Sequence, residues 1–170
     1  RIVKIEENIT PEEEWEIIDL NGLSVSPGFI DAHSHNDWFA IKNEPQKYFE
    51  PFIRQGITSF ITGNCGLSAV GFEADSQHVD KVGGGLFSYS DTTGVYPTVS
   101  EFLEAVDGNS PCNIAVLAGH CSARASVAGY ENRPLTDDER KRMLDFITEP
   151  TSVWERLKET DKPILLYGMG

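Results

Sequence analysis

The sequence predicts an α/β fold built around a parallel sheet. Three short apolar runs lie at residues 29–35, 57–62 and 113–118, and segments with helical spacing or capping motifs separate them. These runs lack strict alternation of apolar and polar residues, which is typical of strands covered on both faces. Strands that alternate with helices run parallel. The chain has 170 residues, 39% of them apolar, which is enough to bury the core of one domain.

Residues 1–26 are expected to form the end of a small β domain that precedes the parallel sheet. Short apolar runs alternate there with turn signals, and Asn21-Gly22 lies between two of them. Asn-Gly between extended segments is typical of a hairpin turn. Pro27-Gly28 then separates this part from the first strand of the sheet.

Helices are predicted at residues 45–55, 98–106 and 136–147. The first has aromatic and aliphatic side chains at helical spacing. The other two each begin with a threonine followed three residues later by a glutamate, which is the spacing of a capping box. Residues 67–97 are rich in Gly, Ser and Asp, with three consecutive glycines in the middle, and they predict a long loop.

Charge and composition exclude several classes of partner. The net charge of -13 argues against nucleic acids and anionic membranes, because these surfaces attract Lys and Arg. No apolar run approaches the length of a bilayer span, and the first residues do not resemble a signal peptide. Three cysteines are too few, and odd in number, for a disulfide framework. We therefore expect a cytoplasmic protein.

Two histidines at the end of the first predicted strand have the spacing of metal ligands. Residues i and i+2 of a strand point to one face, so the imidazoles of His33 and His35 can reach one ion. Asp31 and Asp37 flank the pair and could orient the rings by accepting hydrogen bonds. The alternative is a pair of polar residues at a strand end that simply face solvent.

Three stretches of the chain resemble a known superfamily. Residues 27–37, PGFIDAHSHND, resemble the first barrel strand of the amidohydrolases. Residues 56–66, which end in GNCG, and residues 113–136 narrow the resemblance to the D-aminoacylase group, the N-acyl-D-amino-acid deacylases. The resemblance covers about residues 1–147. It implies the N-terminal part of a (β/α)₈ TIM-like barrel of a metal-dependent hydrolase, which is incomplete because a full barrel takes about 250 residues.

In this interpretation, residues 27–147 are the first βα units of the amidohydrolase barrel. Residues 148–170 do not match the family and stay unassigned. They look like the opening of another α/β segment, which a truncated gene, an internal deletion or a fusion junction would each explain.

The resemblance also implies a zinc site with one or two Zn²⁺ ions. The cysteine of the matching Asn-Cys-Gly is a metal ligand in the D-aminoacylase group, so His33, His35 and Cys65 are the candidate ligands. From the residues alone, Cys65 could also be a buried packing residue. The family takes two further histidine ligands and a catalytic aspartate from later strands. No catalytic residue is therefore assigned in this chain, and the general base is expected outside it.

Two further residues are candidates for substrate binding. His120 ends the third predicted strand and either lines the pocket or packs at the rim of the barrel. Arg124 either binds a substrate carboxylate through two hydrogen bonds or forms a structural ion pair. Cys112 and Cys121 are expected to be packing residues, and His78, in the long loop, is expected to face solvent.

The function implied by the resemblance is zinc-dependent hydrolysis of a non-peptide amide bond in the parent protein. The favoured substrate is a small-molecule N-acyl-D-amino acid. If the protein is an enzyme, a cyclic amide is the alternative substrate. The alternative from another class is a non-catalytic fragment or binding module that lacks the full metal site. A partial barrel exposes strand edges that can pair with another copy of the chain, so a homo-oligomer is also possible.

Overall fold

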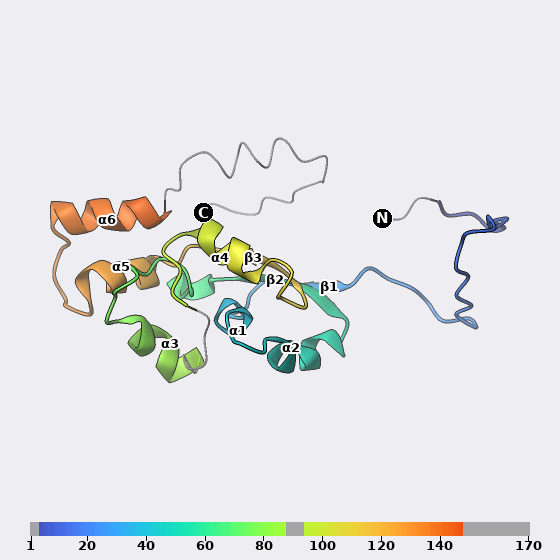
Figure 1. Cartoon of the computed structure of the whole chain (residues 1–170), viewed down its shortest axis with the longest axis horizontal. Coiled ribbons are helices and arrows are strands. Elements are labelled where there is room, and N and C mark those ends of the chain that lie inside the picture. The colour runs from blue at the N-terminus through green and yellow to red at the C-terminus, as the bar shows by residue number, and fades with distance from the viewer. Residues whose placement is uncertain (1–3, 88–93, 148–170) are drawn as a thin grey trace.

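The computed structural model describes residues 4–87 and 94–147, which fold around a three-stranded parallel sheet (Figure 1). The strands are β1 (Phe29–Asp31), β2 (Ile57–Thr62) and β3 (Asn113–Val116), in the order β1-β2-β3. The α/β class and the parallel sheet are therefore confirmed. The unassigned segment 148–170 lies outside the described residues.

Helices flank the sheet, and two of them begin at the predicted capping boxes. The helices are α1 (Asp37–Ala40), α2 (Gln46–Ile53), α3 (Val79–Phe87), α4 (Val99–Val106), α5 (His120–Ala128) and α6 (Asp137–Ile147), and a 3₁₀ turn, η1 (Asn64–Gly66), follows β2. The Thr98 hydroxyl accepts the Glu101 N–H at 3.2 Å, and the Glu101 carboxylate accepts the Thr98 N–H at 3.0 Å. Thr136 and Glu139 make the same reciprocal pair. Each box satisfies N–H groups that a helix start leaves unpaired.

The main core lies on the sheet face that carries Phe60. This side chain is 1% exposed, and its ring meets Phe49 of α2 edge to face, with 5.4 Å between ring centroids. Phe102 of α4 belongs to the same core. The opposite face, which carries Ala115, is more exposed. Because the three strands are parallel, the segments that follow them meet at one edge of the sheet.

The prediction of an uninterrupted loop at residues 67–97 is wrong, because α3 forms there and includes the three glycines. Glycine in a helix costs about 1 kcal/mol relative to alanine. Val79, Val82 and Phe87 are nevertheless buried in the main core. The Phe87 ring stacks on Trp38 with 5.5 Å between centroids. Packing of this apolar face outweighs the low helix propensity of the glycines.

Helix α5 follows β3 closely and was not predicted from the sequence. Its residues are small and it lacks a distinct apolar stripe, so its periodicity is weak. Small side chains are buried around much of its surface: Ser122, Ala123, Ala125, Ser126 and Val127. The signals that mark it are the glycines at its two ends, Gly119 and Gly129.

Residues 4–26 extend away from the body of the molecule as an arm (Figure 1). The predicted strands are absent from it, although the predicted turn is present. The Leu23 N–H donates to the Leu20 carbonyl at 2.9 Å, and Asn21 and Gly22 have φ of 50° and 85°, as in hairpin turns. The apolar side chains of the arm are exposed, and a hairpin with no packed face is only marginally stable.

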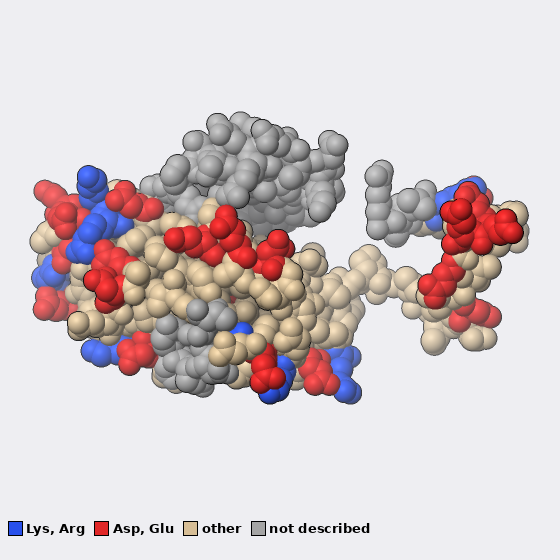
Figure 2. Space-filling model, viewed as in Figure 1, with Lys and Arg blue, Asp and Glu red and all other residues tan. Residues whose placement is uncertain are grey.

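Acidic side chains dominate the charge of the surface. Figure 2 shows them gathered on the N-terminal arm and over α4, whereas basic and acidic side chains are mixed near α6. The net charge is -13. Within the described residues, no helix has both the length and the apolar character needed to cross a membrane. The absence of a nucleic-acid partner stays a prediction.

Ion pairs attach α6 to the preceding part of the chain. Arg133 donates two hydrogen bonds to the Glu139 carboxylate, at 2.7 and 2.8 Å. Arg142 donates to Glu73 at 2.7 Å. The hydrogen bonds from Arg133 are the largest cause that holds the pKa of Glu139 well below its ordinary value of 4.5.

We expect Glu139→Gln to lower the melting temperature at pH 7, and this deficit to shrink as the pH falls below 4.5. A carboxylate whose pKa is depressed by folding contributes stability that is complete above its unfolded pKa, here 4.5, and is lost as the pH falls toward its folded pKa. Thermal unfolding of both proteins across this range measures the difference.

The matched control is Glu131→Gln, which removes the exposed carboxylate that also pairs with Arg133, at 2.7 Å. An exposed pair contributes little, so this control should lower the melting temperature less. A deficit for Glu139→Gln that stays constant from pH 7 to pH 3 would contradict the assignment.

Candidate metal centre

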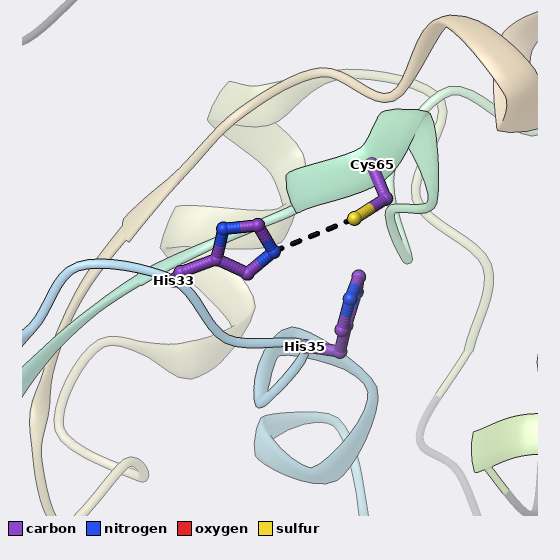
Figure 3. Close-up of side chains that lie close together, drawn as sticks. All are labelled: His33, His35 and Cys65. Carbon is purple, nitrogen blue, oxygen red and sulfur yellow. Dashed lines mark hydrogen bonds between the residues drawn. The ribbon is translucent and has the colours of Figure 1, made fainter.

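The structure brings His33, His35 and Cys65 together. Both histidines lie in an irregular segment beyond β1, so the strand is shorter than the predicted 29–35 and strand alternation does not explain their convergence. Cys65 lies in η1, beyond β2. One ligand atom from each of the three residues lies within 4.8 Å of the others (Figure 3).

The separations within this cluster fit a small metal ion. His33 Nε2 lies 3.4 Å from Cys65 Sγ, and Figure 3 shows the two groups pointing toward one another. The rings of His33 and His35 have centroids 6.1 Å apart and are nearly perpendicular, at 77°. Nitrogen and sulfur ligands of tetrahedral zinc lie about 3.6 Å apart, given their usual bond lengths. Only a small adjustment of His35 would complete this part of a coordination shell.

The protein orients the ring of His35 from two sides. His35 Nδ1 lies 3.4 Å from the Leu67 carbonyl oxygen. A carbonyl can only accept, so a hydrogen bond here uses a proton on Nδ1, and in the neutral ring that tautomer has its lone pair on Nε2. The Phe87 ring packs against the imidazole with 5.0 Å between centroids. The carbonyl contact and the Phe87 ring therefore hold the orientation of the His35 imidazole.

Cys65 occupies a backbone conformation that side chains seldom adopt. Its φ of 58° and ψ of 18° are left-handed, and the neighbouring Gly63 and Gly66 have φ of 76° and 74°. The left-handed region costs a residue with a Cβ about 1–2 kcal/mol. Such strain persists where the surrounding structure imposes it, often at functional sites. Here it presents an exposed thiol toward His33.

The two aspartates that flank the histidines bond to the backbone and not to the rings. Asp31 accepts the backbone N–H of His33 at 3.1 Å. Asp37 is fully buried and accepts the Ala69 N–H at 2.7 Å. Burial raises the pKa of Asp37 to about 6, although this hydrogen bond opposes the shift. The expectation that these carboxylates orient the imidazoles is therefore wrong.

His120 and Arg124 lie on α5, outside the three-residue cluster. His120 is the first residue of the helix and is exposed. The Arg124 guanidinium donates to the backbone carbonyls of Gly129, Glu131 and Arg133, at 3.4, 3.1 and 2.8 Å. Arg124 thus closes the loop after α5 through carbonyl groups and not through a structural ion pair, which was one of its two expected roles. A substrate-binding role for either residue stays a prediction.

Two other expectations need correction. Cys121 is exposed and lines a hollow of about 330 Å³ together with Arg124 and Tyr130, so it is not a packing residue, whereas Cys112 is buried as expected. His78 is half-buried and not solvent-facing, because its ring packs edge to face on Tyr130 at 5.8 Å between centroids.

Buried serines that no sequence pattern singles out fix the segment after Cys65 to α5. The Ser122 hydroxyl accepts the Ser68 N–H at 2.9 Å and donates to the Ser68 carbonyl at 2.7 Å. Both serines are fully buried. Small polar residues of this kind resemble loop residues in a sequence, and only their burial reveals their role.

Comparison with known proteins places the chain in a family. The sequence model of the "Amidohydrolase family" matches residues 16–160, so the match extends beyond residue 147, where the resemblance was expected to end. The chain belongs to the amidohydrolase family. It is 33% identical over 135 residues to a D-aminoacylase of Alcaligenes xylosoxydans xylosoxydans, covering 78% of this chain and 26% of that protein. An N-acyl-D-aspartate deacylase of the same organism is 33% identical over 137 residues, with the same coverage.

Two solved structures have a fold similar to that of this chain over much of its length. A crystal structure of D-aminoacylase is 31% identical, with a TM-score of 0.53, and covers 71% of this chain and 24% of that one. An N-acyl-D-glutamate deacylase from Bordetella bronchiseptica, solved with zinc and a phosphonate inhibitor, is 27% identical with a TM-score of 0.51 and the same coverage. The chain spans about a quarter of the length of the curated relatives it matches.

Proposed function

We propose that this chain supplies the first βα units of a (β/α)₈ barrel in a zinc-dependent hydrolase that deacylates N-acyl-D-amino acids. The observation that carries the proposal is the cluster of His33, His35 and Cys65 beyond the carboxyl ends of β1 and β2. Active sites of such barrels lie at this end of the strands. The activity is proposed for the whole protein, because the chain corresponds to about a quarter of its curated relatives.

The donor set suits zinc. Two imidazole nitrogens and one thiolate are borderline and soft ligands. Zinc binds ligands of these types well, whereas magnesium and calcium prefer oxygen ligands. A zinc ion held there would supply Lewis-acid polarisation of the scissile carbonyl and would lower the pKa of the attacking water. His33 and His35 would contribute neutral nitrogen lone pairs, and the Cys65 thiolate would offset part of the charge of the cation. One or two ions fit this proposal.

The names of the relatives support the substrate class. D-aminoacylase, N-acyl-D-aspartate deacylase and N-acyl-D-glutamate deacylase act on D-amino acids acylated on nitrogen. This chain is 29–33% identical to these three proteins. We therefore place the proposed substrate in the same class and leave the amino-acid side chain open. No residue of this chain is assigned the proton transfer.

Two measurements test the proposal. Elemental analysis of protein purified without chelator should give about one zinc or more per chain. The whole protein should then release free amino acid from N-acetyl-D-amino acids faster than from the matched L-enantiomers and from cyclic amides. Absence of zinc would overturn the metal site. Zinc without hydrolysis would overturn the catalytic part and leave a binding module.

A further inference from the structure

The side chain of Asn64 connects the two segments that carry the candidate ligands. Its amide group donates to the Ser34 carbonyl at 3.2 Å and to the Ile61 carbonyl at 2.9 Å. Both partners are carbonyl oxygens, so only the NH₂ group can face them, and this fixes the orientation of the amide. Ser34 lies between the two histidines, and Asn64 itself precedes Cys65.

These bonds fix the backbone on both sides of Ser34. Its N–H, part of the peptide that joins it to His33, donates to the Ile61 carbonyl at 3.1 Å. Its carbonyl, part of the peptide that joins it to His35, accepts from Asn64. Peptide groups are planar and run from Cα to Cα, so fixing both planes places the Cα atoms from which the two imidazoles extend.

The same side chain anchors the strained turn of Cys65. The Ile61 carbonyl at the end of β2 receives one of the two Asn64 bonds, and η1 begins at Asn64. Cys65 follows with its left-handed φ of 58°. A ligand in an unfavourable conformation keeps its direction only while its neighbours are held. Asn64 therefore constrains all three candidate ligands at once.

Other contacts attach the same segments to the fold. Asp37 accepts the Ala69 N–H, and Ser122 bonds to both backbone groups of Ser68. All of these residues are buried. Asp37 lies three residues after Ser34, and its partner Ala69, like Ser68 and Ser122, follows η1 in the sequence. Loss of the Asn64 amide would thus leave the segments attached and remove the bonds that align the ligand groups.

We propose that Asn64 is a positioning residue for the metal centre, which holds His33, His35 and Cys65 in the geometry that binds a cation. This inference rests on the proposed metal site. Groups that orient metal ligands without touching the metal typically cost about 10- to 100-fold in affinity when removed.

The test compares Asn64→Ala with Asn113→Ala. Asn113 is the matched control, because its amide also bridges to β2, donating to the Thr58 carbonyl at 3.2 Å and the Ser59 hydroxyl at 3.3 Å, but at the opposite end of the strands. Cobalt serves as the probe, since its absorption spectrum reports both binding and ligand geometry. Melting temperatures of the metal-free proteins are measured alongside.

We expect Asn64→Ala to lower cobalt affinity about 10- to 100-fold and to change the spectrum at saturation. Asn113→Ala should lower the melting temperature by a similar amount and leave affinity within about twofold, since it lies away from the ligands. If Asn64→Ala does not fold, Asn64→Ser keeps a polar side chain that is too short to reach both carbonyls, and the same result is expected.

Three outcomes overturn the inference, and one of them also removes the proposed function. Equal affinity in the Asn64 and Asn113 variants means that Asn64 is only structural, while the metal site stands. An Asn64 variant whose cobalt spectrum at saturation is unchanged, and whose affinity falls only in proportion to its stability, also shows that Asn64 is only structural. Absence of cobalt binding by the unsubstituted protein overturns the proposed metal site, and this inference with it.

Discussion

Replacing Cys65 with alanine is expected to lower zinc affinity by more than about 100-fold, because removing a ligand should exceed the cost of removing a group that only orients one. The thiolate is one of three donors in the cluster and the only anionic one. Competition with a chromophoric chelator measures the change. The double variant His33→Ala/His35→Ala should lower zinc affinity by at least as large a factor. Cys121→Ala is the matched control, because Cys121 is also exposed but lies outside the cluster, and it should retain zinc.

Cys65→Gly separates loss of a ligand from loss of the fold. Glycine accepts the φ of 58° without strain, and the exposed cysteine gives up little packing when it is removed. We expect the metal-free glycine variant to be no less stable than the parent, and up to about 1 kcal/mol more stable. It should still fail to hold zinc. A glycine or alanine variant that binds zinc within about threefold of the parent would show that Cys65 is not a ligand.

The fold was predictable where local signals and tertiary packing agree. β2 appears at the predicted residues, and both capping boxes form where Thr98 and Thr136 indicate. Helix α3 was missed because its glycines argue against a helix, and only burial of residues such as Phe87 in the core decides the matter. Helix α5 was missed because its small side chains are buried on several sides and leave little periodicity.

The candidate site was predictable as a set of residues and less so as a geometry. His33, His35 and Cys65 converge as expected, yet the histidines do so from a bend beyond β1. The partners that orient them are backbone carbonyls and an asparagine amide, as for the Leu67 carbonyl and Asn64. Backbone groups carry no sequence signal, so these contacts become visible only in three dimensions.

Gly63→Ala is expected to destabilise the protein by about 2–5 kcal/mol, the sum of a left-handed penalty of about 1–2 and an overpacking cost of about 1–3. Gly63 has a φ of 76°, and a Cβ there would lie 2.1 Å from the Leu117 carbonyl oxygen. That carbonyl belongs to backbone, which cannot swing aside as a side chain can. Urea unfolding of the metal-free proteins measures the change.

Gly108→Ala measures the left-handed penalty alone, so its difference from Gly63→Ala gives the cost of the close approach. Gly108 has a similar φ of 71°, but nothing lies within 4 Å of its Cβ position, so about 1–2 kcal/mol is expected. Relief of the clash at Gly63 must move η1 away from the end of β3, and η1 carries Cys65. Gly63→Ala should therefore also weaken zinc binding, whereas Gly108→Ala should not. Equal effects of the two substitutions on stability and on zinc would mean that the metal centre does not depend on the contact between Gly63 and Leu117.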